Sequence, residues 1–223
     1  MSLNTIELTS GPAPQASIII LHGLGADGED FVPICHELDL TEAGPVRYVL
    51  PSAPAIPVSI NGGYVMRAWY DIRQPGQGPR EDEAGLRQSQ QAIQALIERE
   101  IARGMPASRI VLMGFSQGCA MALMTGLRYP QRLAGIVALS GYLPLLDATA
   151  AERHEANVHT PIFMAHGQDD DVVLMSRGTQ SRDHLASWGT PSIGTTTPWT
   201  TLCVWKKSKT FRAGSTGFWY QPN

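Results

Sequence analysis

Short apolar runs alternate with longer amphipathic stretches along the chain. Five runs end in small or turn-forming residues: 17–21 (SIIIL), 46–50 (VRYVL), 109–113 (RIVLM), 135–139 (GIVAL) and 161–165 (PIFMA). Continuous apolar runs of this length are typical of strands buried on both faces of a parallel sheet. Helices are predicted between them at 83–103, 117–129 and 172–187. The alternation predicts a doubly wound, mostly parallel α/β sheet.

Composition narrows the class of protein further. The 223 residues are 43% hydrophobic with a net charge of −3, which fits one compact domain and excludes a disordered chain. The balanced charge gives no reason to expect nucleic acid. No run reaches the roughly 18 apolar residues of a membrane helix, and no signal peptide pattern is visible. Cys35, Cys119 and Cys203 are too widely spaced for a disulfide framework. We therefore expect a cytoplasmic protein without stable membrane insertion.

The sequence GFSQG at 114–118 predicts a catalytic serine. This G-x-S-x-G pattern follows an apolar run and precedes a stretch of small residues, which is the context of a sharp strand-to-helix turn. Such a turn lifts Ser116 above the sheet edge. It also aims the backbone N–H of Gln117, at the start of the helix, toward a developing oxyanion. Ser116 is the predicted nucleophile and Gln117 a predicted oxyanion donor.

A second oxyanion donor is expected from the loop after the first strand. That loop reads His22-Gly23-Leu24-Gly25, and its glycines permit a close backbone approach. The N–H of Leu24 is the candidate donor. His22 is interpreted as a structural residue that joins neighbouring loops, rather than as a proton carrier.

The acid of a Ser-Asp-His triad should follow a later strand in this topology. The sequence His166-Gly167-Gln168-Asp169-Asp170-Asp171 comes directly after the apolar run at 161–165. Three adjacent aspartates are also compatible with a solvated or metal-binding turn. An acid role is favoured.

At this point the chain resembles the small carboxylesterases related to acyl-protein thioesterases and lysophospholipases. The resemblance rests on LHGLGADGEDF at 21–31, PSAPAIPVSINGGYVMRAWYDI at 51–72, GFSQGCAMAL at 114–123, LSGYLP at 139–144 and HGQDDDVV at 166–173. Together these segments extend over residues 15–187 in the family's order.

The resemblance implies an α/β-hydrolase fold without a large cap domain and a triad with Ser116 as nucleophile and Asp170 as acid. It implies Leu24 and Gln117 as oxyanion donors, and it places Trp69 in the segment that lines the acyl pocket. It implies no metal, no organic cofactor and a homodimer.

The third member of the family's triad is a histidine about thirty residues after the acid, and this chain has no histidine after His184. The composition also changes there. Residues 184–223 contain no Asp or Glu, four Lys or Arg, and four of the five tryptophans. Neither a last strand nor a final amphipathic helix can be identified, so residues 188–223 are interpreted as an atypical tail on a hydrolase domain of residues 1–187.

A frameshift explains this tail. The stretch TTTPWTTLCVWKKSKTF at 195–211 can be back-translated so that a frame shifted by two bases reads His-Asp-Tyr-Pro-Met-Asp-His-Ser-Val-Cys-Leu-Glu-Glu-Ile. That hidden sequence resembles the family's histidine loop. The codon of its second histidine straddles those of Thr200 and Thr201. The hypothesis is wrong if the gene does not spell this motif in a shifted frame.

The predicted function is that of a serine carboxylesterase acting on short- to medium-chain esters through an acyl-enzyme on Ser116. A thioesterase or lysophospholipase acting on longer acyl chains is the rival within the class. The alternative outside this class of enzyme is an inactive hydrolase-fold scaffold, since a serine without a general base attacks poorly. His22 and His166 are the nearest replacements by topology.

Overall fold

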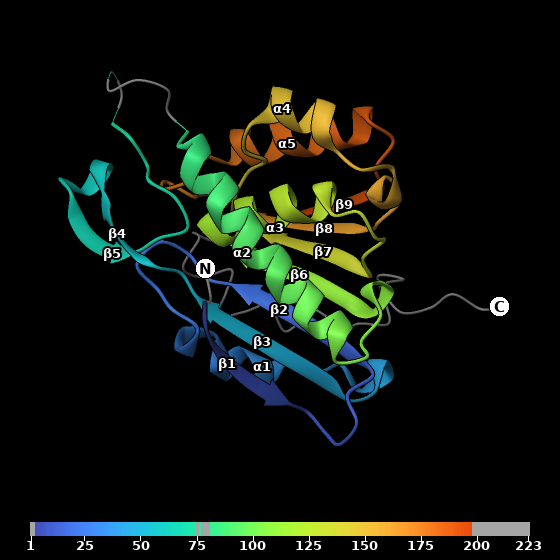
Figure 1. The fold of residues 1–223 in the computed structure, drawn as a ribbon. Coiled ribbons are helices and arrows are strands. Elements are labelled where there is room, and N and C mark those ends of the chain that lie inside the picture. The colour runs from blue at the N-terminus through green and yellow to red at the C-terminus, as the bar shows by residue number, and fades with distance from the viewer. Residues whose placement is uncertain (1–2, 75, 77–80, 198–223) are drawn as a thin grey trace.

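The structure is a computed structural model that describes residues 3–74, 76 and 81–197. Its main sheet has seven strands in the order β1-β3-β2-β6-β7-β8-β9, and β1 alone runs antiparallel to its neighbour (Figure 1). The seven strands are β1 (Asn4–Thr9), β2 (Ala16–Leu21), β3 (Val46–Ser52), β6 (Ile110–Phe115), β7 (Gly135–Leu139), β8 (Ile162–Gly167) and β9 (Ser192–Thr197). This arrangement confirms the predicted mostly parallel α/β-hydrolase sheet, and no cap domain is evident in the described part of the chain.

The remaining elements connect these strands. The helices are α1 (Val32–Glu37), α2 (Glu83–Ala102), α3 (Gln117–Arg128), α4 (Leu146–Glu152) and α5 (Met175–Ser187). A separate antiparallel hairpin is formed by β4 (Ala55–Val58) and β5 (Tyr64–Arg67). Short 3-10 turns cover Glu29–Phe31, Thr41–Ala43, Ser59–Asn61, Ala107–Arg109 and Glu155–Asn157.

The five predicted strands and three predicted helices all exist, with ends shifted by three residues at most. The elements that the apolar pattern did not predict are short or half-exposed. Strand β1 lies at the sheet edge with no fully buried residue, and α1 has only six residues with a proline in its first turn. Edge strands and short helices bury too little surface to leave a clear apolar pattern.

The last strand, which could not be identified in the sequence, is present after residue 187. Strand β9 pairs in parallel with β8 from Ile162↔Ser192 to Gly167↔Thr197. Its sequence, SIGTTT, is too polar to stand out as a buried strand. The sheet therefore continues beyond the predicted boundary at residue 187. Residues 198–223, with the rest of the predicted tail and the shifted histidine codon, lie outside the described residues.

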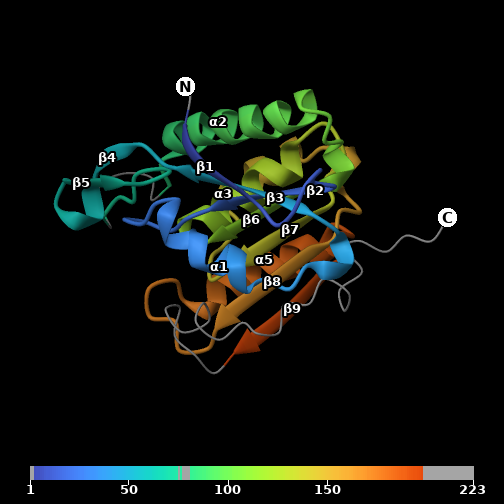
Figure 2. The same cartoon turned by 90° about the horizontal axis from the view of Figure 1, so that it is seen from below.

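The helices pack on both faces of the sheet. Helices α2 and α3 lie on one face, and α1 lies on the other (Figure 2). Accordingly the buried residues form two clusters: one joins the sheet to α2, α3 and Leu185 of α5, and the other joins it to Cys35 of α1 and to Phe31, which precedes that helix. None of the described helices is long and apolar enough to cross a membrane.

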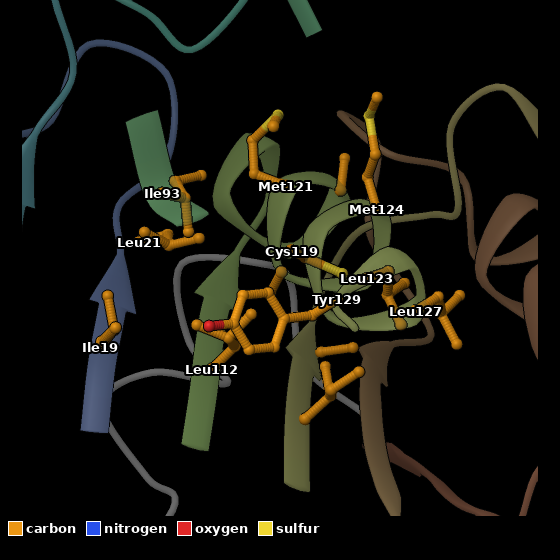
Figure 3. Packing of buried hydrophobic residues seen from close by; sticks show 14 of the residues in the cluster. Ile19, Leu21, Ile93, Leu112, Cys119, Met121, Leu123, Met124, Leu127 and Tyr129 are labelled. Atoms are coloured by element: carbon orange, nitrogen blue, oxygen red, sulfur yellow. The ribbon is translucent and has the colours of Figure 1, made fainter. Parts of the chain in front are cut away.

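Helix α3 is the central element of the larger cluster. All twelve of its residues are buried, and Figure 3 shows its side chains in one cluster with the sheet residues Ile19 and Leu112 and with Ile93 of α2. A helix without an exposed face is held on every side. The first turn of α3, which follows Ser116 directly, is therefore a rigid support for the residues at the carboxyl edge of the sheet.

Candidate active site

Ser116 occupies a strained turn between β6 and α3. Its backbone has φ 53° and ψ −115°, a conformation that non-glycine residues rarely adopt, and its N–H donates to Leu139 O at 2.9 Å. Strain of this kind persists only where the surrounding structure imposes it, and it is concentrated at functional sites. The side chain is half-buried, and no described residue hydrogen-bonds its hydroxyl. The geometry fits the nucleophile turn expected from GFSQG.

Two glycines make this turn sterically feasible. A methyl group on Gly114 would lie 2.0 Å from Gly118 O, and one on Gly118 would lie 2.0 Å from Leu21 O. Both contacts are with backbone atoms, which cannot move aside as a flexible side chain can. The two glycines of the motif therefore allow α3 to begin directly against β2 and β6.

The loop after β2 lies against the serine. A methyl group on Gly23 would be 3.2 Å from the ring of Phe115 and 3.4 Å from Ser116 Cβ. No described residue accepts a hydrogen bond from the backbone N–H of Leu24 or of Gln117. Both groups that the sequence predicts as oxyanion donors are thus free, and each belongs to a segment in contact with Ser116.

Asp170 lies at the same edge of the sheet. The register aligns Phe115 with Leu139 and Leu139 with Ala165, so the segments after β6, β7 and β8 emerge side by side. The Asp170 side chain is fully buried, and its Oδ1 accepts from the N–H groups of Val172 (3.0 Å) and Val173 (2.8 Å). Its Oδ2 is buried and has no hydrogen-bond partner in the described part of the chain. This oxygen is available to accept from a further donor.

Of the three adjacent aspartates, only Asp170 is buried; Asp169 and Asp171 are exposed. The metal-binding interpretation gains no support from the residues around them. Within residues 3–74, 76 and 81–197, no group of three or more His, Cys, Asp or Glu side chains is placed to hold a metal ion.

His22 is held between two backbone groups. Its Nε2 accepts from Ala53 N at 2.9 Å, so its Nδ1 carries the hydrogen and donates to Gly23 O at 2.7 Å. Burial lowers the pKa of His22, which favours this neutral form. Both ring nitrogens are used, and the contacts agree with the structural role predicted for this residue.

His166 is equally unsuited to act as the base. Its Nε2 donates to Val173 O at 2.7 Å, and Nδ1 faces α5, where a methyl group on Gly178 would lie 2.5 Å from it. His166 Nε2 is also 3.4 Å from Asp170 Oδ2, but its hydrogen is directed at the Val173 carbonyl, which is the closer acceptor. The contact therefore leaves Asp170 Oδ2 without a hydrogen bond.

The other histidines lie outside this cluster. His154 caps a 3-10 turn by accepting from Ala156 N, and the His184 ring contacts Trp188. The chain has six histidines, all described, and none hydrogen-bonds Ser116. The described residues thus place a serine, two free N–H groups and a carboxylate at one edge of the sheet, and no described histidine hydrogen-bonds the serine.

Trp69 lies beside the site, but its ring is directed inward. The residue is 1% exposed, and its indole N–H donates to His22 O at 2.8 Å. Little of this ring is exposed to a substrate in the structure, and its role in lining the acyl pocket stays a prediction. The Gln117 side chain, which accepts from Trp69 N, was not predicted as part of the site; its only signal in the sequence is its place next to the serine.

Comparison with known proteins shows the family to which the chain belongs. The family described as Phospholipase/Carboxylesterase matches residues 4–197. The chain is a member of the phospholipase/carboxylesterase family of α/β-hydrolases, which confirms the resemblance seen in the sequence.

Individual relatives give the same result. Acyl-protein thioesterase 1 of Yarrowia lipolytica is 38% identical over 182 residues, 81% of this chain and 80% of the relative. Acyl-protein thioesterase 1 of Neurospora crassa is 44% identical over 183 residues, 78% and 74% of the two chains. The crystal structure of Arabidopsis thaliana SOBER1 superposes with a TM-score of 0.78 at 32% identity, over 83% of this chain and 90% of that one. Esterase PE8 superposes with a TM-score of 0.77 at 26% identity, over 90% and 92%.

Proposed function

We propose that this site is that of a serine carboxylesterase that hydrolyses short- to medium-chain carboxylic esters through an acyl-enzyme on Ser116. The observation that carries the proposal is the strained Ser116 turn at the start of α3, with the unpaired N–H groups of Leu24 and Gln117 on either side. Free donors beside a nucleophile stabilise the oxyanion of acyl transfer.

The proposed reaction has two steps. Ser116 Oγ attacks the ester carbonyl carbon and its proton passes to the base. The carbonyl oxygen becomes an oxyanion held by Leu24 and Gln117, and the C–O bond then breaks as the leaving alcohol takes the proton. Water, deprotonated by the same base, attacks the acyl-serine and releases the acid and the free serine.

The base is the part of the site that the described residues do not supply. We propose that it is the histidine of the frame shifted by two bases, whose codon straddles those of Thr200 and Thr201. Two observations support this. Thr197, the last described residue of β9, pairs with Gly167 at the edge of the sheet where Asp170 lies, and it comes three residues before Thr200 in the sequence. Asp170 Oδ2 is a buried acceptor without a partner, as expected of a carboxylate shaped to receive an imidazole N–H.

The test is hydrolysis of p-nitrophenyl butyrate by two chains. One has the printed sequence, and the other is encoded by the same gene read in the shifted frame from the codon of Gly194 onward. We expect the shifted-frame chain to turn over at about 1 s⁻¹ or faster, which is ordinary for an enzyme. The printed chain should be no faster than its Ser116→Ala variant and would then be an inactive scaffold.

Other outcomes contradict separate parts of the proposal. A Ser116-dependent rate of about 1 s⁻¹ in the printed chain would overturn the frameshift and direct attention to His22 and His166. A shifted-frame chain that folds but shows no Ser116-dependent rate would overturn the esterase function.

A second candidate is an acyl-protein thioesterase, because that is the activity in the names of the relatives from Yarrowia lipolytica and Neurospora crassa. Both substrates react at the same serine, so the discriminating quantity is the acyl chain length. We expect kcat/KM of the shifted-frame chain to be higher for p-nitrophenyl butyrate than for an S-palmitoyl peptide. The reverse order would favour the thioesterase.

A further inference from the structure

Trp69 connects the two segments that carry the candidate oxyanion donors. Its indole N–H donates to His22 O at 2.8 Å, at the start of the loop that contains Leu24. Its backbone N–H donates to Gln117 Oε1 at 3.0 Å. One buried residue is thus hydrogen-bonded to both sides of the site.

The Gln117 side chain completes this connection. Its Oε1 accepts from Trp69 N, and its Nε2 donates to Tyr70 O at 2.9 Å, so both ends of the amide are bonded to adjacent residues of one segment. The residue is 3% exposed. Because the backbone N–H of Gln117 is itself a candidate donor, the side chain fixes the peptide unit on which that donor lies.

The segment around Trp69 is in turn anchored to the rest of the protein. Ser89 of α2 donates its hydroxyl hydrogen to Trp69 O, and Ala68 N donates to Pro54 O at 3.1 Å. Neighbouring contacts hold the opposite loop: Gly25 N donates to Arg67 O at 2.9 Å. Trp69 therefore belongs to a segment with little freedom to shift.

We propose that Trp69, together with the Gln117 amide, is a positioning residue that fixes the separation of the Leu24 and Gln117 N–H groups. This inference rests on the proposed function. The two donors lie on different loops, after β2 and after β6, and a tetrahedral oxyanion is stabilised only if both point at one place. A misplacement of about 1 Å costs about 100-fold in rate.

The first test measures oxyanion binding without turnover, in the printed chain. In butylboronic acid, Ser116 Oγ adds to boron and its proton passes to solvent, which leaves an anionic tetrahedral adduct with a hydroxyl where the oxyanion would lie. We expect Trp69→Phe, which keeps an aromatic ring but loses the indole N–H, to weaken Ser116-dependent binding about 10- to 100-fold. Trp188→Phe is the matched control, because Trp188 lies at the end of α5 and contacts Arg153 and His184. It should change binding less than twofold.

Each result decides a separate question. Equal boronate affinity for the parent and Trp69→Phe overturns the positioning role and leaves the esterase proposal intact. If Ser116→Ala binds the boronate as well as the parent does, no oxyanion site exists at Ser116, and the proposed function and this inference are both wrong.

A second variant acts from the other side of the connection and leaves the indole in place. Gln117→Met removes both amide bonds, and in the shifted-frame chain it should lower kcat for p-nitrophenyl butyrate about 10- to 100-fold with KM unchanged. That pattern is expected for an interaction made only in the transition state. A raised KM that depends on acyl length, with kcat unchanged, would instead assign Trp69 and Gln117 to the pocket wall. If Trp69→Phe does not fold, as judged by thermal unfolding, Gln117→Met alone decides.

Discussion

The two sides of the candidate site differ in how completely their buried side-chain polar groups are paired. On the oxyanion side, both ring nitrogens of His22, the indole N–H of Trp69 and both ends of the Gln117 amide have partners. On the acid side, Asp170 has one oxygen with two donors and one oxygen, buried, with none in the described part of the chain.

This difference indicates which half of the chemistry the described chain contains. Leaving a buried hydrogen-bond acceptor without a donor costs about 1–3 kcal/mol of folding free energy. An unpaired oxygen on Asp170 therefore points to a donor that the site is built to receive. The groups that would stabilise charge are complete within residues 3–197. The relay that would move the proton still needs a base, which we propose is encoded beyond β9.

The largest expected effect comes from changing the acid. Asp170→Asn keeps the size of the side chain but presents a different hydrogen-bonding group to an imidazole. In the shifted-frame chain we expect kcat for p-nitrophenyl butyrate to fall about 10⁴-fold, as in a serine protease with the corresponding change. In the printed chain the same substitution should leave the rate unchanged. An equal loss in both chains would mean that a base already present in the printed chain works with Asp170.

A smaller effect is expected on the oxyanion side from Gly118→Ala. The added methyl group would lie 2.0 Å from Leu21 O, a backbone atom held in β2. We expect the free energy of unfolding in urea to fall by about 1–3 kcal/mol. The control is Gly11→Ala, whose methyl group would be 3.4 Å from the Pro45 side chain, with an expected change below about 0.5 kcal/mol. Equal losses in the two variants would contradict the close approach of α3 to β2.

The smallest effect concerns pH. Burial lowers the pKa of His22, so the folded protein resists a proton that the unfolded chain takes up near pH 6.5. The contribution of the neutral His22 ring to the free energy of unfolding is complete above pH 6.5. It is lost as the pH falls toward the lower pKa that His22 has in the folded protein. We expect the free energy of unfolding in urea to decline between pH 7 and pH 5. The slope should correspond to the uptake of at most about one proton on unfolding. His22→Gln should reduce the slope, whereas substitution of exposed His36 by glutamine should leave it unchanged.

The strands that were predicted correctly differ from those that were missed, such as β9, in what the sheet requires of them. Gly135–Leu139 was predicted with its true ends because it is buried on both faces and reads as an unbroken apolar run. Strand β9 joins only β8 in the described structure, and its threonines carry no apolar pattern, so pairing with β8 decides that it is a strand.

The candidate site shows the same division. The sequence could propose Ser116, Leu24 and Gln117 from local motifs whose backbone shape follows from glycines and strand ends. The choice of Asp170 among three adjacent aspartates came from the resemblance to the family. It could not show that the Gln117 side chain bonds to Trp69 and Tyr70, because these residues lie 48 and 47 positions away along the chain. A glutamine or a tryptophan looks the same in a sequence whether it faces solvent, substrate or another loop.

The sequence by itself determined the positions of the buried strands along the chain, the sharp turn at Ser116 and the lack of a histidine beyond His184. These features are local: they depend on runs of apolar residues, on glycines that permit a backbone conformation, and on which residues are present. Only the tertiary structure decided that His22 is held neutral between two backbone groups and that Trp69 joins the two oxyanion segments. It alone decided that one oxygen of Asp170 has no partner among the described residues. The reason is that hydrogen bonds between residues distant in the sequence depend on burial and on which strand ends lie side by side at the edge of the sheet. No single stretch of the chain encodes either property.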